Sequence, residues 1–210
     1  MINEISALGF NTIRIPFSSE NIRNTGITNL NVNYNANPAL KGLNSIQALD
    51  YAVAYMASLD PPMHFILDHH SCQSDNFVNE NRWYTTVCSE AQWIADWEFL
   101  AARYVDNLSF LGCDIHNEPR GADSATGSLW GSGNSLNDWS IAATKAANAI
   151  LAVNPNLLIF VEGNEFYEGV YNWWGGNAIG HKLYPIVTTV ANRVVISPHD
   201  YGPLVYNQPW

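Results

Sequence analysis

The sequence predicts an α/β fold in which a parallel sheet forms an incomplete (β/α)8 TIM barrel. Five short apolar segments alternate with segments of helical spacing, as in repeated strand–helix units. The apolar segments end near residues 16, 68, 116, 162 and 198, and each is followed by polar or ionisable groups. We therefore expect residues 1–210 to be one domain with a site at the strand ends.

The first half of the chain supplies two predicted strands and two predicted helices. Residues 2–8 form the end of a helix, which Gly9 stops because glycine readily adopts a left-handed conformation there. Residues 11–16 form a strand that Pro16 ends. After an Asn-rich loop over 18–44, apolar residues recur at helical spacing from Ile46 to Met56, and residues 64–67 form the second strand.

The second half supplies two more helices and three more strands. A loop over 71–88 leads to a helix that starts with Ser89-Glu90-Ala91-Gln92, a capping-box pattern. Residues 110–115 form the third strand. A Gly- and Ser-rich loop over 121–135 then precedes a helix over about 137–153. Residues 157–161 and 194–197 form the fourth and fifth strands.

Two architectures are compatible with these elements, a barrel and an open doubly wound sheet. A doubly wound nucleotide-binding fold would carry a Gly-rich turn after its first strand, and Pro16-Phe17-Ser18-Ser19 is not one. Ionisable groups at several strand ends favour the barrel, whose active sites lie there. Because a complete barrel has eight strands, we expect a partial barrel with about strands 2 to 6 present.

Composition excludes some partners and leaves neutral ligands open. The formal net charge is −10, with only nine Lys and Arg residues, which argues against nucleic acid and against anionic membrane surfaces. We find no apolar run long enough for a transmembrane span and no signal-peptide pattern at the N-terminus. Oligomeric state is not predicted.

The three cysteines and the adjacent histidines His69 and His70 are the candidates for a metal or disulfide site. We expect Cys113 to be buried in a strand. Cys72 and Cys88 are expected in loops or at a helix edge, so one of them could pair with a cysteine outside this chain. His69 and His70 should point to opposite sides of their strand, without a third ligand at suitable spacing. No metal, nucleotide or flavin site is therefore predicted.

The segment Asp114-Ile115-His116-Asn117-Glu118-Pro119 carries the strongest candidate for acid/base chemistry. Glycoside hydrolysis needs a carboxyl group that protonates the leaving oxygen, and a carboxyl partly withdrawn from water has a raised pKa. Glu118 fits this role, and the Asn117 amide could bind a substrate hydroxyl; the alternative for Glu118 is a turn cap. Glu162, at another strand end, is either a second catalytic carboxylate or a hydrogen-bonded structural residue.

Other polar and aromatic residues are expected around the same site. Arg14 could hold a carboxylate with its guanidinium, or form a structural ion pair. His70 follows a strand, and His199 and Tyr201 share one face of an extended segment. Trp173 and Trp174 precede two glycines, which suits an exposed sugar-stacking loop. Most other tryptophans are expected in the core.

Taken together, these segments resemble glycoside hydrolase family 5, also called cellulase family A, and especially its secreted endo-β-1,4-glucanases. The resemblance covers nearly the whole chain in the family's order but lacks its first strand and C-terminal third. It is carried by residues 8–16, 66–70, 114–119, 159–163, 173–176 and 197–202.

The resemblance implies roles for individual residues. Glu118 corresponds to the general acid/base, Asn117 to the residue that binds the sugar 2-hydroxyl, and Arg14 to the residue that positions the nucleophile. His70, His199 and Tyr201 correspond to groups around the cleaved sugar, and one of Trp173 and Trp174 to a stacking platform. Glu162 matches a residue that the family does not use as nucleophile.

The family's nucleophile is a Glu in a Gly-Glu-Phe-Gly-like segment after strand seven, and residues 1–210 contain no such segment. The resemblance therefore implies a secreted, retaining endoglucanase acting on β-glucan, with the nucleophile outside this chain and little activity in residues 1–210 alone. The alternatives are a β-mannanase or mixed-linkage β-glucanase on the same barrel, and a non-catalytic sugar-binding or truncated product.

Overall fold

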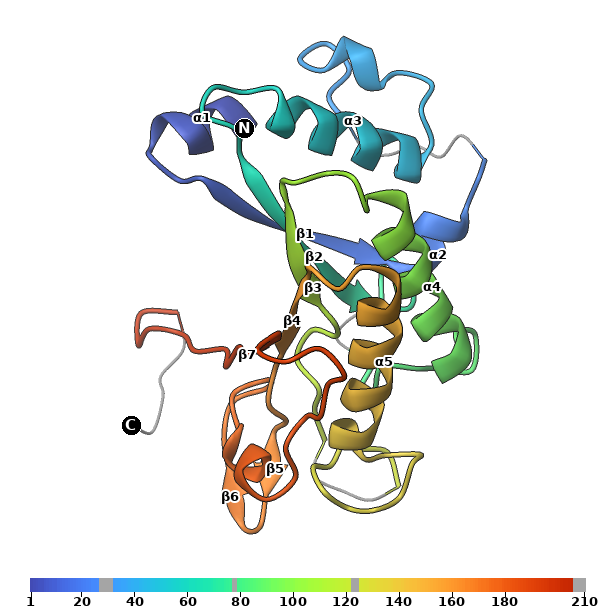
Figure 1. Ribbon diagram of the computed structural model, residues 1–210, viewed down its shortest axis with the longest axis vertical. Helices are drawn as coiled ribbons and strands as arrows, with labels where there is room; N and C mark the ends of the chain where they lie inside the picture. Colours follow the sequence, from blue (N-terminus) through green and yellow to red (C-terminus); the bar gives the residue numbers. More distant parts are fainter. Residues whose placement is uncertain (27–31, 77–78, 122–124, 206–210) are drawn as a thin grey trace.

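The computed structural model describes residues 1–26, 32–76, 79–121 and 125–205. These residues form a five-stranded, fully parallel sheet in the order β1-β2-β3-β4-β7 (Figure 1). The strands are β1 (Thr12–Ser18), β2 (His64–Ser71), β3 (Phe110–Asp114), β4 (Leu158–Val161) and β7 (Val194–Ile196). The predicted parallel sheet and its five strands are thus confirmed. Parts of the three predicted loops, residues 27–31, 77–78 and 122–124, lie outside the described residues.

The helices also follow the predicted order. They are α1 (Ile2–Ala7), α3 (Ser45–Ala57), α4 (Glu90–Arg103) and α5 (Trp139–Val153). Ser89 caps α4 as expected, but the side chain of Gln92 bonds to Asp96 rather than completing a capping box. The reciprocal box is instead found at α3, between Asn44 and Gln47.

Three local features differ from the sequence prediction. β1 continues two residues beyond Pro16, because β1 is an edge of the described sheet and its outer side needs no hydrogen-bond donor from proline. The predicted loop over 18–44 contains a short helix, α2 (Ser19–Arg23), and a 3-10 turn (Pro38–Leu40). A hairpin of β5 (Phe166–Tyr167) and β6 (Val170–Tyr171) and a second 3-10 turn (Ile179–Lys182) lie between β4 and β7.

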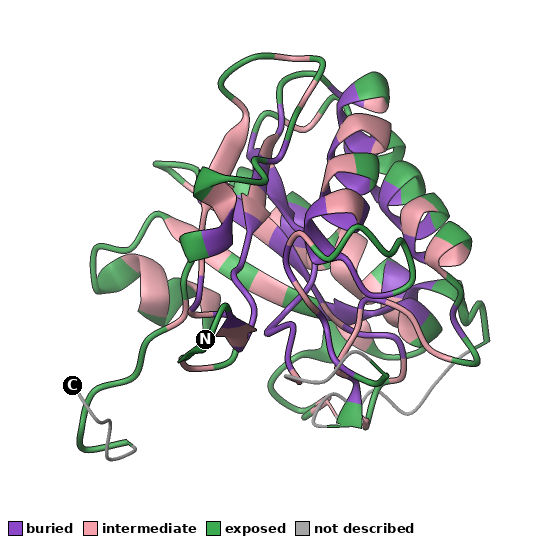
Figure 2. Cartoon of the chain, turned by 90° about the horizontal axis from the view of Figure 1, so that it is seen from below, coloured by how far each residue is buried: buried purple, intermediate pink, exposed green. Residues whose placement is uncertain are grey.

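The core lies between the sheet and the helices that cover it. α4 and α5 pack side by side, and buried residues gather on the surfaces that they turn toward the sheet (Figures 1 and 2). Trp83, Trp93 and Trp139 form a compact cluster whose ring centroids lie 5.4–6.3 Å apart. These three, with Trp97 and Trp130, are buried, which agrees with the expectation that most tryptophans serve the core.

Within the described ranges, no helix combines the length and the apolar character needed to cross a bilayer.

Candidate active site

The carboxyl ends of the strands meet at a cluster of charged groups around Arg14 on β1. Its Nη1 lies 2.8 Å from Asp68 on β2, its Nε lies 2.8 Å from Asp114 on β3, and its Nη2 lies 3.1 Å from Glu162 after β4. Nη2 also donates to Oδ1 of Asn117 at 3.1 Å. One guanidinium thus joins four strand ends, which puts residues far apart in sequence at a single site.

Glu118 lies beside this cluster in an uncommon backbone conformation. Its φ is 47°, in the left-handed region that favours glycine, and its N–H donates to Oε2 of Glu162 at 2.7 Å. Gly175 packs directly against this hydrogen bond. A Cβ at position 175 would lie 2.3 Å from Oε2 of Glu162 and 3.4 Å from the Cα of Glu118, so the position has no room for a side chain. The buried carboxylate of Glu162 therefore helps to hold the backbone that aims Glu118.

The carboxylate of Glu118 is held by two groups from the segment after β7. Nδ1 of His199 lies 3.0 Å from Oε1 of Glu118, and the hydroxyl of Tyr201 donates to the same oxygen at 3.2 Å. Nε2 of His199 lies 2.9 Å from Oε1 of Glu162, so this imidazole bridges the two glutamates. His199 and Tyr201 thus share one face of the chain, as the sequence predicted.

The pKa of Glu118 differs from the sequence prediction. Burial opposes ionisation of this carboxyl, but the hydrogen bond and charge of His199 and the hydrogen bond from Tyr201 outweigh it, so the pKa is lowered. For His199, burial opposes the charge, whereas its bonds to Glu118 and Glu162 raise the pKa to about 10. The expectation of a raised pKa is wrong for this structure, because it considered burial without the paired cation.

The two buried carboxyls on the other side of the cluster show the opposite shift. Burial is the largest cause in both, raising the pKa of Glu162 and raising that of Asp114 well above its ordinary value. Asp114, Glu162 and His199 place ligand-type atoms within 4.8 Å of one another, an arrangement that could hold a metal ion. However, the guanidinium of Arg14 contacts both carboxylates, so a positive charge already lies against them.

The remaining polar candidates have distinct places. His70 binds Oδ2 of Asp68 through Nδ1 at 2.7 Å, at the edge of the Arg14 cluster. His69 points to the other side of β2, where its ring nitrogens contact Ser19 at 3.0 Å and His116 at 3.1 Å. The expected opposite orientation of the two histidines is confirmed. Burial is the largest cause that lowers the pKa of both His69 and His116, so this inner pair is neutral at physiological pH.

Aromatic groups line one side of the site. The rings of Trp173 and Tyr201 meet edge to face with centroids 5.1 Å apart, which links the tryptophan loop to the group that holds Glu118. Trp174 is partly exposed, with the guanidinium of Arg120 stacked 4.2 Å from its ring centroid. Nε1 of Trp174 donates to Glu165 at 3.1 Å. The loop thus presents aromatic faces in a fixed orientation, as a sugar-stacking platform would require.

Core tryptophans support the strand ends beneath the site. Nε1 of Trp93 and Nε1 of Trp97 both donate to the carbonyl of Ile115, at 3.0 and 3.1 Å, and Trp139 donates to the carbonyl of Glu162 at 2.8 Å. The sequence predicts core positions for these tryptophans but does not reveal their hydrogen bonds. The spacing of Trp93 and Trp97, one helical turn apart, was the available signal.

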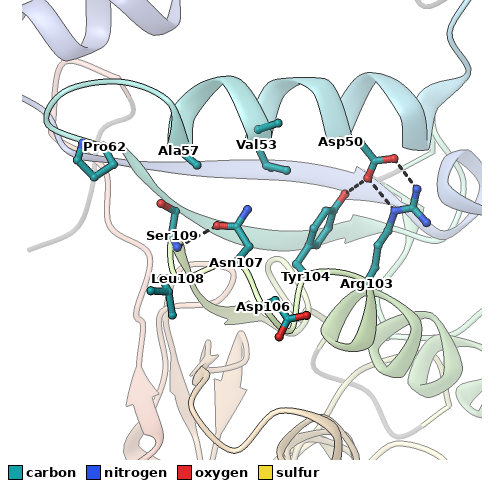
Figure 3. A pocket seen from close by; sticks show the side chains of 11 residues that line it. Asp50, Val53, Ala57, Pro62, Arg103, Tyr104, Asp106, Asn107, Leu108 and Ser109 are labelled. Atoms are coloured by element: carbon teal, nitrogen blue, oxygen red, sulfur yellow. Dashed lines mark hydrogen bonds and ion pairs between the residues drawn. The ribbon is translucent and has the colours of Figure 1, made fainter.

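A cavity of about 650 Å³ lies near the amino ends of β2 and β3, away from the Arg14 cluster (Figure 3). It is bordered by Pro62 and Ser109, which precede β2 and β3, and by α3 and the end of α4. Its charged groups include Asp50 and Arg103, which pair with each other, and Asp50 also accepts from Tyr104 at 2.9 Å. Because sites in parallel α/β folds lie at the carboxyl ends of strands, we take the Arg14 cluster and Glu118 as the candidate active site.

Comparison with known sequences points to one family over the whole chain. The family model described as cellulase (glycosyl hydrolase family 5) matches residues 1–210. An endoglucanase of Paenibacillus polymyxa is 43% identical over 213 residues, covering 100% of this chain and 51% of the relative. The major extracellular endoglucanase of Xanthomonas campestris pv. campestris is 38% identical, covering 100% of this chain and 42% of the relative. The chain thus spans about half the length of these relatives.

Solved structures agree with the sequence comparison. An endocellulase from Pyrococcus horikoshii, studied as a complex with cellotetraose, superposes with a TM-score of 0.86 at 37% identity, covering 100% of this chain and 58% of that one. The catalytic domain of the major endoglucanase of Xanthomonas campestris gives a TM-score of 0.86 at 37% identity, covering 99% of this chain and 58% of that one. The five-stranded sheet therefore corresponds to part of a TIM barrel.

Proposed function

Because this chain belongs to the cellulase family, glycosyl hydrolase family 5, we propose that it is the part of a retaining endo-β-1,4-glucanase that carries the general acid/base, Glu118. The observation that carries the proposal is the setting of Glu118. Its carboxylate lies at the strand ends, accepts hydrogen bonds from His199 and Tyr201, and adjoins the Arg14 cluster. In this role it protonates the leaving oxygen and then takes a proton from water.

The nucleophile in this proposal is a Glu outside residues 1–210. Glu162 is a poor nucleophile because it is fully buried and both its oxygens are engaged, Oε1 by Arg14 and His199 and Oε2 by the N–H of Glu118. A retaining mechanism needs two carboxyl groups about 5 Å apart on either side of the scissile bond. We infer that Arg14 organises the floor of the site and helps to place the second carboxylate.

The other site residues act on the substrate in this proposal. Asn117 offers its amide to a sugar 2-hydroxyl while its Oδ1 stays on Arg14. His70 lies near the cleaved sugar, and Trp173 and Trp174 supply flat apolar surfaces for neighbouring sugar rings. The substrate is a β-glucan polysaccharide, which the cellotetraose complex of a structural neighbour supports. Secretion is supported by the extracellular relative in Xanthomonas.

The experiment that tests the proposal compares hydrolysis with binding. Purified 1–210 should release no more reducing sugar from a soluble β-glucan than its Glu118→Gln variant does, because one carboxyl group is not enough. The chain should nevertheless bind cellotetraose, and Trp173→Ala should weaken that binding in calorimetry. Measurable hydrolysis by 1–210 that Glu118→Gln abolishes would overturn the placement of the nucleophile.

Substrate choice and catalytic competence need separate tests. A gene that encodes a Gly-Glu-Phe-Gly-like segment beyond residue 210 supports an enzyme, whereas one that lacks it supports a non-catalytic sugar-binding product. Digestion of carboxymethylcellulose against mannan and mixed-linkage β-glucan by a protein that carries this segment then separates a cellulase from the alternative activities, because loops outside the strands decide the substrate.

A further inference from the structure

A buried pair of histidines joins the carboxyl ends of three neighbouring strands, on the face of the sheet opposite the Arg14 cluster. Nδ1 of His69 on β2 lies 3.1 Å from Nδ1 of His116, which follows β3. Nε2 of His69 lies 3.0 Å from Oγ of Ser19, the first residue of α2 after β1. All three residues are at most 1% exposed, so these polar contacts are shielded from water.

The histidine pair also adjoins the backbone that carries Asn117. The hydrogen-bonded ladder between β2 and β3 ends at the pair of Asp68 and Asp114. Beyond it, the N–H of Asn117 donates to the carbonyl of His69 at 3.0 Å. His69 is thus bonded through its side chain to His116 and through its backbone to the next residue, at the point where the chain leaves β3 for the proposed acid/base.

Aromatic rings enclose the pair and exclude charge from it. His69 packs against Phe17 and Trp93, with ring centroids 5.5 and 6.4 Å apart, and His116 packs against Trp139 at 6.0 Å. Burial lowers the pKa of both imidazoles, so both are neutral at physiological pH. Two neutral imidazoles that meet through Nδ1 must be different tautomers, because one supplies the N–H and the other the lone pair.

The surroundings of the outer nitrogen indicate which tautomer each ring adopts. Nε2 of His116 is buried and has no hydrogen-bond partner among the residues that the structure describes. As with backbone groups, a buried N–H without an acceptor is rarer than a buried acceptor without a donor. The proton of His116 therefore lies on Nδ1 and is donated to Nδ1 of His69. His69 then carries its own proton on Nε2 and donates to Ser19.

We propose that His116 is a positioning residue, whose Nδ1–H bond to His69 fixes the backbone that aims Asn117 and Glu118. The inference rests on the proposed function, which assigns these two residues to the sugar and to its leaving oxygen. The φ of Glu118 is 47°, a conformation that persists only where the surrounding structure holds it. Glu162 holds this backbone from the inner side of the sheet, and the histidine pair holds it from the helix-covered side.

The first test reads the tautomers in the unmodified chain. The imidazole 15N chemical shifts at about pH 7 should show the proton on Nδ1 in His116 and on Nε2 in His69. The same tautomer in both rings, the reverse arrangement or a charged ring would overturn the proposal. This measurement needs no substrate, so it decides the inference separately from cellotetraose binding, which tests the proposed function.

The second test compares His116→Asn with His116→Leu, which have nearly the same shape. The asparagine amide can place an N–H where Nδ1 lies, whereas leucine cannot donate. In the leucine variant, the N–H of Asn117 should exchange with deuterium about tenfold faster relative to the core amide of Leu67. The pKa of Glu118 should rise toward its ordinary value, because its contacts with its two hydrogen-bond donors loosen. The asparagine variant should match the unmodified chain in both measurements.

A third variant and the remaining outcomes complete the design. His181→Leu, at a histidine whose ring centroid lies 6.1 Å from that of Trp130, should change neither measurement. Unchanged exchange and pKa in His116→Leu, or equal behaviour of the two His116 variants, would overturn the positioning role. The tautomers of the unmodified chain decide the question if the leucine variant does not fold. Expected tautomers in a chain that does not bind cellotetraose would count against the proposed function alone.

Discussion

Replacing Arg14 with glutamine should destabilise the chain in a way that depends on pH. The guanidinium contacts three carboxyl groups, those of Asp68, Asp114 and Glu162, at 2.8, 2.8 and 3.1 Å. The side chains of all three are at most 3% exposed, whereas that of Arg14 is 34% exposed. Removing Arg14 leaves buried negative charge without a partner, which costs far more than losing a surface ion pair.

The size of the loss follows from the burial on the two sides of the cluster. Removing one partner of a buried ion pair costs about 3–5 kcal/mol. Two facts place Arg14→Gln near the lower end, at about 3 kcal/mol: water screens the partly exposed guanidinium, and burial raises the pKa of Asp114 so that it can hold a proton instead. In a chain of this length, that loss lowers the Tm by about 6–12 °C.

The assay is urea denaturation followed by circular dichroism at about pH 7 and about pH 4.5. Without Arg14, the folded-state pKa values of Asp114 and Glu162 lie further above their unfolded values, so the folded variant binds more protons and loses stability as the pH rises. The deficit relative to the unmodified chain should therefore be larger at neutral pH. The control is Arg103→Gln, which breaks a pair with Asp50 in which the side chains are 34% and 33% exposed, and which should cost less than about 1 kcal/mol. Equal losses for the two variants, or no change with pH, would refute the reasoning.

Three further predictions concern His199 and Gly175. His199→Asn should raise the pKa of Glu118, measured by carboxyl NMR titration, since the paired cation is lost; an unchanged pKa would contradict this. The stabilisation that His199 provides should be complete below its unfolded pKa of about 6.5 and should disappear as the pH rises through about 10. In pH-dependent denaturation, the His199→Asn variant should not show this loss of stability. Gly175→Ala should lower the Tm and weaken cellotetraose binding in calorimetry, because its Cβ would meet Glu162; Gly133→Ala, where a Cβ would meet nothing, is the control for added volume at positive φ.

The sequence predicted the sheet because its strands are apolar throughout and separated by long amphipathic helices. Those patterns depend only on which residues are buried, so they can be recognised in the sequence without knowing the tertiary contacts. The hairpin over β5 and β6 has strands of two residues each, which is too short for any periodicity to emerge. The short helix α2 lies in a segment that the sequence predicted as a loop, although Ser18 is a residue type that favours the N-cap and accepts there from the N–H of Asn21.

The sequence could predict which residues belong to the candidate site, but not how their charged groups pair with one another. The sequence named Arg14 as a site residue and predicted that His199 and Tyr201 share one face, and the structure shows that both of these contact Glu118. Local sequence could not show that Arg14 would contact carboxylates from three other strands, because those contacts depend on how the sheet brings residues 68, 114 and 162 together.

The lowered pKa of Glu118 bears directly on the role proposed for it. A proton donor must hold its proton at the working pH, yet His199 and Tyr201 favour the ionised form of this carboxyl. A second carboxylate about 5 Å away would oppose that preference, because a like charge raises the pKa of its neighbour. The contacts within residues 1–210 thus favour an ionised Glu118, and in the proposed mechanism the acid half of the cycle depends on the charge of the nucleophile. The carboxylate that completes the mechanism would in this way also set the protonation state of Glu118.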